Sequence, residues 1–198
     1  RGVDMLFICA GMGGGTGTGS APVVAQLAKE QGAIVIAMVT YPFVLERART
    51  IKAEEGIQRL SEVCDTVIVI DNNRLAELVP NLPIQYAFRV ADELVARVVS
   101  GITETITQPS LINLDFADVR SIMTGHGLSM IAVGESKSVN RVEEAVADTL
   151  NNTLLDVDIA GAKGALIHIT GGPELTLGEA NAIWEMLTEQ IDAKATVI

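Results

Sequence analysis

The segment from Gly13 to Ser20, with the sequence GGGTGTGS, constrains the fold of this chain more than any other. It follows an apolar run at 4–10 and precedes a helical pattern that has Pro22 in its first turn and ends near Gly32. Glycines between a buried strand and a helix let several backbone N–H groups converge on one point at the helix N-terminus. The sequence therefore predicts a strand, an anion-binding loop and a helix capped by Ser20.

The composition of this loop separates it from other phosphate-binding loops. Its two threonines add hydroxyl donors without formal charge, and its five glycines exceed what a tight turn without a ligand needs. It is not a Walker A loop, because no Gly-Lys-Ser/Thr follows, and Ser20 stands where a dinucleotide fingerprint has Gly or Ala. An NAD-dependent oxidoreductase is therefore the weakest alternative. The residues expected to bind phosphate are Gly13, Gly14, Gly15, Thr16, Gly17, Thr18 and Gly19.

The rest of the chain alternates apolar runs with helical patterns. Further strands are expected at 33–40 and 66–70, with a polar helix at 45–63 between them. Only 4% of the residues are aromatic while Ala, Val, Ile, Leu and Gly dominate, which is typical of parallel strands that helices bury on both faces. The expected fold class is α/β, with a parallel sheet flanked by helices.

A long central helix is expected after this sheet. Asn72 and Asn73 can cap a short helix that ends before Pro80, and Pro83 then opens a helix that reaches about Thr107. Apolar residues recur along it at three- and four-residue steps and predict one continuous buried face. These residues are Ile84, Ala87, Phe88, Ala91, Val95, Val98, Ile102 and Ile106.

Beyond Pro109 the pattern restarts as a second α/β domain. Its expected elements are a loop and short helix at 113–123, helices at 139–151 and 175–191, and strands at 128–134 and 165–170. We therefore expect two domains, residues 1–108 including the long helix and residues 109–198. The chain enters its first strand almost at once and stops at 195–198 in what reads as another strand, so both domains are expected to be partial.

Charge and hydropathy exclude several classes of partner. A net charge of −11 argues against nucleic acid, which requires clustered Lys and Arg. The longest apolar run, at 33–39, is far shorter than the ~20 residues that span a bilayer, and no signal peptide opens the chain. A cytoplasmic protein without direct membrane insertion is expected.

The cysteines and histidines predict no further chemistry. Cys9 and Cys64 lie in or beside apolar runs without CxxC spacing, so two buried thiols are expected. His126 and His168 have no acidic or cysteine partner at metal-ligand spacing. We therefore predict no protein metal site and read both histidines as structural.

Four motifs, in order and spacing, resemble FtsZ of the tubulin-related GTPases. They are GGGTGTGS, PFVLE at 42–46, AFRVADE at 87–93 and NLDFADV at 113–119, and the similarity covers essentially the whole chain. The resemblance implies a partial tubulin-like GTPase domain, head-to-tail filaments and a catalytic loop that acts on the neighbouring subunit's nucleotide. FtsZ also has strands and a phosphate loop ahead of Asp4, and further strands beyond Ile198, so this chain alone is expected to bind GTP poorly.

The resemblance assigns the guanine contacts to the long helix. Phe88 and Asp92 match the residues that stack on and read the base, and positions four apart lie on one helix face. A carboxylate accepts from both N1–H and the 2-amino group of guanine, which adenine cannot offer. Asn72 matches a further base or sugar contact. Without the resemblance, Phe88 would be a core residue, Asp92 a solvated charge and Asn72 a helix cap.

Glu46 matches the acid that contacts the ribose in this family. FtsZ sequences usually place a Gly after that acid and an Arg four residues beyond it. Here Arg47 follows the acid and Thr50 occupies the fourth position, while Arg49 comes one step early. The sequence leaves the arginine of this site unassigned.

The motif NLDFADV carries the catalytic residues that the resemblance implies. Asp115 and Asp118 are three residues apart and would project the same way in a helical turn, with Asn113 just upstream. Read alone, Asp115 is an N-cap and Asp118 a favourable first-turn charge. In FtsZ such residues position the attacking water in the next subunit's site, with Mg²⁺ offsetting the phosphate charge.

The sequence thus predicts a GTP-hydrolysing cytoskeletal protein that binds GTP/GDP and Mg²⁺, polymerises with copies of itself and acts at the division site. Division-ring proteins and membrane tethers are further partners that the resemblance implies. The alternative is a tubulin-family protein that binds nucleotide or polymer without hydrolysis.

Overall fold

The computed structural model describes residues 2–78, 81, 83–108, 116–124, 127–151 and 159–198. Its main feature is a parallel sheet of four strands in the order β1-β2-β3-β4. The strands are β1 (Met5–Gly11), β2 (Ile34–Tyr41), β3 (Thr66–Asp71) and β4 (Gly127–Ser129). The predicted α/β class and parallel sheet are confirmed.

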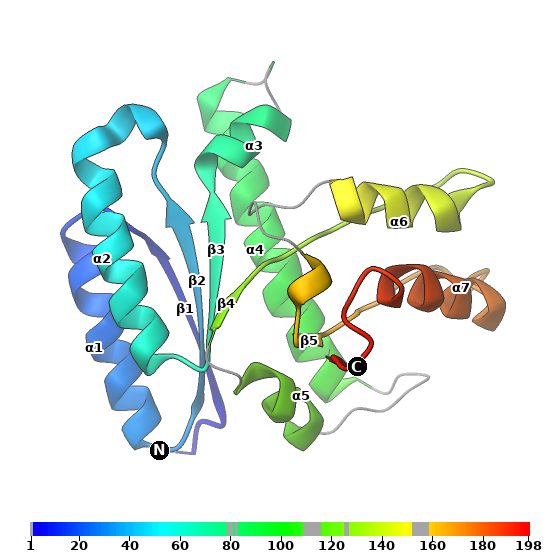
Figure 1. Cartoon of the computed structure of the whole chain (residues 1–198), viewed down its shortest axis with the longest axis horizontal. Helices are drawn as coiled ribbons and strands as arrows, with labels where there is room; N and C mark the ends of the chain where they lie inside the picture. Colours follow the sequence, from blue (N-terminus) through cyan, green and yellow to red (C-terminus); the bar gives the residue numbers. More distant parts are fainter. Residues whose placement is uncertain (1, 79–80, 82, 109–115, 125–126, 152–158) are drawn as a thin grey trace.

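Helices cover both faces of this sheet (Figure 1). On one face lie α1 (Thr16–Glu30) and α2 (Arg47–Val63), and on the other α4 (Ile84–Thr107) and α5 (Phe116–Met123). Strand β2 explains the uninterrupted apolar run in the sequence, because successive side chains point to opposite faces and both faces are buried. Val35, Ala37 and Val39 pack toward α1 and α2, whereas Ile34, Ile36 and Met38 pack toward α4 and α5.

Shorter elements complete the chain. A one-turn helix η1 (Val44–Glu46) follows β2, and α3 (Asn72–Leu78) follows β3 directly. The later part contains α6 (Arg141–Asn151), η2 (Ile159–Gly161), α7 (Leu177–Thr188) and a pair of two-residue parallel strands, β5 (Gly164–Ala165) and β6 (Thr196–Val197). The strands expected at 128–134 and 165–170 are therefore much shorter, because only their first residues pair with a neighbouring strand.

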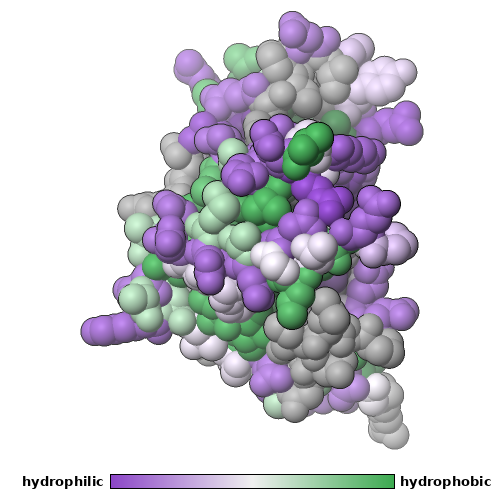
Figure 2. Space-filling view, turned by 90° about the vertical axis from the view of Figure 1, so that its right-hand side faces the viewer, coloured by the Kyte–Doolittle hydropathy of each residue, from purple (hydrophilic) through white to green (hydrophobic). Residues whose placement is uncertain are grey.

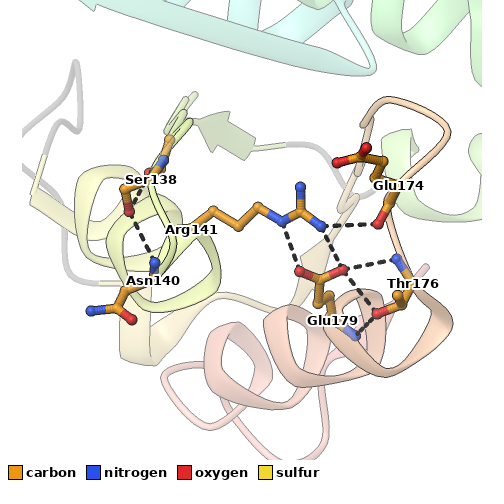
Figure 3. A network of polar contacts seen from close by, with 7 residues as sticks. Ser138, Asn140, Arg141, Glu174, Thr176 and Glu179 are labelled. Carbon is orange, nitrogen blue, oxygen red and sulfur yellow. Dashed lines mark hydrogen bonds and ion pairs between the residues drawn. The ribbon is translucent and has the colours of Figure 1, made fainter.

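Helices α6 and α7 are joined by a network around Arg141 (Figure 3). Its guanidinium Nε lies 2.7 Å from one carboxylate oxygen of Glu179, and Nη2 also donates to the carbonyl of Glu174. The same carboxylate accepts from the backbone N–H and hydroxyl of Thr176, which caps α7. These bonds lower the pKa of Glu179 to about 2.

The face that bears α6 and α7 is mostly hydrophilic, with apolar side chains visible near its centre (Figure 2).

The predicted helix caps are wrong at two places. Helix α1 begins at Thr16, so Ser20 lies inside it and donates its hydroxyl proton to the carbonyl of Thr16. Asn72 is the first residue of α3, and the backbone N–H of Asn73 is capped by Asp71 at 2.8 Å. In both cases the helix starts closer to the strand than the sequence suggests, which tightens the strand-to-helix connection.

The two cysteines differ in exposure. Cys64 is buried as expected, and burial raises the pKa of its thiol to about 11. Cys9 is exposed, so the expectation of two buried thiols is wrong. It lies on β1, which has a neighbouring strand on one side only among the described residues.

His168 has a structural contact, as its Nδ1 lies 3.0 Å from the hydroxyl of Thr105 on α4.

Among the residues that the structure describes, none of the helices combines the length and apolar character needed for a membrane span.

Candidate functional site

The predicted ligand-binding residues gather at the edge of the sheet where the strands end. The glycine loop follows β1, the segment 42–46 follows β2, and Asn72 follows β3. Because the strands are parallel, all three connections emerge at one edge (Figure 1). The start of α4 joins them, since the ring of Phe88 meets that of Phe43 edge-on at 5.9 Å between centroids. The tertiary structure thus brings four separate sequence segments to one site.

The glycine loop is held from within and from α2. The backbone N–H of Gly13 donates to the hydroxyl oxygen of Thr18 at 2.9 Å, so this threonine braces the loop while its own proton remains available as a donor. Gly13 has φ +92°, and a Cβ added there would lie 2.6 Å from the carbonyl oxygen of Arg49. A Cβ on Gly17 would lie 2.5 Å from the carbonyl oxygen of Gly11. Packing within the chain therefore explains these two glycines.

The other glycines of the loop have no such explanation in the described chain. Around Gly14, Gly15 and Gly19, an added Cβ would have no heavy atom within 4 Å apart from adjacent residues and nearby helix backbone, and all three residues are exposed. A turn without a ligand does not require glycine at such positions. Glycine does, however, let a ligand approach the backbone closely. The loop thus leaves its backbone open to a bound group, and we call this open stretch the cradle.

The N-terminus of α1 gives this cradle its charge preference. The first backbone bond of the helix runs from Gly19 N–H to the carbonyl of Gly15, so the N–H groups of the three residues before Gly19 have no acceptor in the helix. The N-cap Gly15 supplies no side-chain bond, and the first turn holds no acidic residue. Free N–H groups and the positive end of the helix dipole favour an anion such as phosphate.

Arg49 is a residue of this site that the sequence could not assign. Its guanidinium Nη1 lies 2.6 Å from a carboxylate oxygen of Glu46, and its backbone lies against Gly13. Arg47 is exposed at the start of α2. Residues three apart on a helix are neighbours, which is the signal that would have favoured Arg49. The structure therefore places an arginine between the glycine loop and the predicted ribose acid.

Asn72 is buried, with 6% of its surface exposed, and its Oδ1 atom has no hydrogen-bond partner among the described residues. A buried polar atom without a partner costs about 1–3 kcal/mol. A ligand that donates a hydrogen bond would remove that cost. The orphaned oxygen therefore fits the predicted contact with a base or sugar.

Phe88 is 43% exposed and does not belong to the core, although its spacing places it on the apolar stripe of α4. Of that stripe, Ala91 and Ile102 are buried and Val95, Val98 and Ile106 are partly buried. Asp92 is exposed one turn after Phe88. An exposed aromatic ring followed one turn later by a carboxylate can stack on and read a purine base.

Only one predicted catalytic residue, Asp118, is among the described residues, and it lies away from the glycine loop. Asn113 and Asp115 fall outside the described residues, and Asp118 is in the first turn of α5. Helix α5 lies at the opposite edge of the sheet, where Thr66 at the start of β3 donates to the carbonyl of Met123 at 2.7 Å (Figure 1). At about 3.3 Å per residue, strands of this length separate the two edges by roughly 20–25 Å. The structure thus keeps Asp118 apart from the glycine loop.

Tyr41 borders the site at the end of β2. Its hydroxyl donates to a carboxylate oxygen of Glu54 on α2 at 2.8 Å. Burial, that hydrogen bond and the charges of Glu54 and Asp71 raise the pKa of Tyr41 to about 12.

Among the described residues, no group of three His, Cys, Asp or Glu side chains could hold a metal ion.

Comparison with known proteins agrees with this fold. Residues 1–80 match the model of the Tubulin/FtsZ family, GTPase domain, and residues 127–198 match that of the FtsZ family, C-terminal domain. The chain is 65% identical over 201 residues to cell division protein FtsZ 2 of Methanocaldococcus jannaschii, covering 100% of this chain and 53% of that protein. It is 59% identical to FtsZ 2 of Halobacterium salinarum, covering 98% of this chain and 50% of that protein.

Solved structures give the same result. The structure described as an empty FtsZ dimer from M. jannaschii matches with a TM-score of 0.92 and 52% identity, covering 98% of this chain and 57% of that chain. CetZ from Methanosaeta thermophila matches with a TM-score of 0.80 and 25% identity, covering 100% of this chain and 58% of that chain. This chain spans about half the length of the curated relatives it matches. It belongs to the tubulin/FtsZ family.

Proposed function

We propose that the protein carrying this chain binds GTP and GDP at the carboxyl edge of the sheet and hydrolyses GTP when a second copy supplies Asp118. Such a protein polymerises head to tail in the cytoplasm and acts at the division site. The observation that carries the proposal is the position of the glycine loop and α5 at opposite edges of one sheet. Asp118 cannot reach a phosphate on its own chain's loop across about 20–25 Å of strand.

Head-to-tail stacking removes that separation. If one copy is placed above another with the same orientation, the edge with α5 meets the next copy's edge with the glycine loop. Such a contact joins two different surfaces, so it repeats without closing and generates a filament. Hydrolysis would then depend on assembly, because each site is completed by its neighbour.

Each part of a guanine nucleotide has a match in the described residues. The glycine loop and the start of α1 suit the phosphates, and the Glu46–Arg49 pair suits the ribose. Phe88, Asp92 and the orphaned Oδ1 of Asn72 suit the base or its sugar. Mg²⁺ would enter with the phosphates and offset their charge. By resemblance, Asn113 and Asp115 act beside Asp118 on the attacking water.

The relatives support this proposal. The two curated relatives from M. jannaschii and H. salinarum are named cell division proteins, and one solved relative is described as a dimer. Self-association is therefore proposed for this chain also. Division-ring proteins and membrane tethers are proposed as further partners by resemblance to the family.

Mixing two inactive variants tests hydrolysis between subunits. Asp118→Ala retains nucleotide binding but lacks the catalytic carboxylate, and Asp92→Ala retains Asp118 but binds guanine weakly. The side chain of Asp92 is exposed and that of Asp118 is half-buried, so neither substitution empties the core. Circular dichroism checks that each variant folds. Neither should hydrolyse GTP alone at low nucleotide concentration. An equimolar mixture should recover up to about a quarter of the wild-type rate, because one junction in four pairs a loaded site with an intact Asp118 at random.

The opposite results are equally informative. A mixture no more active than either variant would contradict catalysis between subunits. Full activity of Asp118→Ala alone would contradict the role of Asp118. If the wild-type protein binds GTP but never hydrolyses it, the non-hydrolysing family member becomes the better description. Pelleting with GTP but not with GDP would support the filament.

A further inference from the structure

Asn73 ties the segment 42–46 to the end of β3. Its Oδ1 accepts from the backbone N–H of Val44 at 3.0 Å. Its Nδ2 donates to Asp71 Oδ1 at 2.7 Å and, at the longer distance of 3.5 Å, to the carbonyl of Pro42. The backbone N–H of Asn73 donates to the same Asp71 oxygen at 2.8 Å. Asp71 thus fixes Asn73 through two bonds, and Asn73 fixes the segment.

The held segment carries two parts of the proposed nucleotide site. Phe43 places its ring edge against Phe88, at 5.9 Å between centroids. The backbone N–H of Phe43 also donates to a carboxylate oxygen of Glu46 at 3.4 Å, and the other oxygen pairs with Arg49. A movement of this segment would therefore displace Glu46, the proposed ribose acid. It would also remove the ring of Phe43 from that of Phe88, which is proposed to stack on the base.

Few apolar contacts hold the middle of the segment. Pro42 is buried, but Val44 is 65% exposed and Leu45 is 94% exposed. Burial of these two side chains therefore contributes little to fixing the backbone. The hydrogen bond from Val44 to Asn73 joins this part of the segment to the start of α3, and Asn73 is bonded in turn to Asp71 at the end of β3.

We propose that Asn73, held by Asp71, is a positioning residue for the base and ribose end of the nucleotide site. This inference rests on the proposed GTP-binding function. Asparagine suits the role because one amide both accepts from Val44 and donates to Asp71. Aspartate at 73 would keep the acceptor but lose the donor and face the charge of Asp71. Alanine would lose both bonds.

The test compares two ligands in the whole protein that carries this chain. GDP contacts the full site, whereas inorganic pyrophosphate contacts the glycine loop alone, so titration calorimetry with both separates positioning of the base and ribose from general damage. Asn73→Ala should weaken GDP binding about fivefold, the effect of a lost hydrogen bond, and leave pyrophosphate binding unchanged. Asn73→Asp should weaken GDP binding at least as much.

A polarity exchange provides the rescue. In the double variant Asp71→Asn with Asn73→Asp, residue 71 donates to residue 73, which still accepts from Val44. GDP affinity should return to within about twofold of wild type. The matched control is Glu77→Ala, which removes an exposed ion pair with Arg74 on the same helix and should leave GDP affinity unchanged.

Three outcomes would overturn the inference. They are unchanged GDP affinity in Asn73→Ala, an equal loss of GDP and pyrophosphate binding, and no rescue by a folded double variant. Failure of the proposed function is a different result, because wild-type protein would then show no preference for GDP over ADP.

Discussion

Arg49 and Glu46 form an ion pair in which the guanidinium Nη1 lies 2.6 Å from a carboxylate oxygen. The backbone of Arg49 simultaneously fills the space where a side chain on Gly13 would lie. One residue thus links the acid after β2 with the glycine loop after β1. This arginine stands three residues after the acid, whereas the family resemblance leads us to expect one at the fourth position.

Replacing Arg49 should therefore affect the ligand more than the fold. Its side chain is 64% exposed, and an exposed ion pair contributes little to stability. We expect Arg49→Ala to weaken GDP binding about tenfold, the loss of a hydrogen bond to a charged group, with little change in Tm. Arg47→Ala is the matched control and should bind GDP within about twofold of wild type. Equal losses in the two variants, measured by calorimetry, would refute the assignment.

Two glycines of the loop should respond differently to alanine. Gly13 has a positive φ and a backbone carbonyl in the way, so Gly13→Ala should lower the free energy of unfolding by about 1–3 kcal/mol. Gly14→Ala meets no atom of the described chain and should change that free energy by less than about 0.5 kcal/mol. It should nevertheless weaken GDP binding, since the methyl group enters the cradle. Urea unfolding and calorimetry measure the two effects, and undiminished binding by Gly14→Ala would argue against a ligand there.

The Arg141–Glu179 pair predicts a loss of stability in acid. The pKa of Glu179 is lowered from 4.5 to about 2 in the folded chain, chiefly by the bond from Arg141 and then by those from Thr176. Such a group stabilises the fold above its unfolded pKa, and this stabilisation is lost as the pH falls from 4.5 toward 2. Glu179→Gln should therefore have a lower Tm than wild type at pH 7, and the difference should shrink through that window. Glu185→Gln on the same helix is the control, and a gap that does not depend on pH would contradict the prediction.

Tyr41 predicts an effect at the alkaline end. Its pKa is raised to about 12 by burial and by the carboxylate of Glu54. A raised pKa means that the stabilisation is complete below pH 10 and is lost as the pH rises through 12. The difference in ultraviolet absorbance between wild type and Tyr41→Phe isolates the titration of this phenol. Its midpoint should lie near 12, and adding Glu54→Gln should move it toward 10. A midpoint near 10 before that change would show that the contact does not form.

The sequence predicted the parts of this fold that depend on local periodicity. The apolar run at 33–39 and the stripe along α4 are patterns that only buried strands and one-sided helices produce, so the class and most elements followed. The positions at which strands end did not follow from the sequence. Strands β4 and β5 stop where the neighbouring strand stops pairing with them, and that point depends on a distant part of the chain. The division of the chain at residue 108 stays a prediction, although the two family matches lie on either side of it.

By itself, the sequence predicted a phosphate-binding loop, since glycines before a helix let backbone N–H groups converge, and it indicated the family. The tertiary structure decided which side chains meet. Phe88 has the spacing of a core residue yet is exposed beside Phe43, and Arg49 reaches Glu46 only because α2 starts immediately after η1. The periodicity of apolar residues shows which face of a helix or strand is apolar, but not which other element packs against that face. The position of Asp118 across the sheet from the glycine loop is likewise set by the direction of the strands, which no local pattern contains.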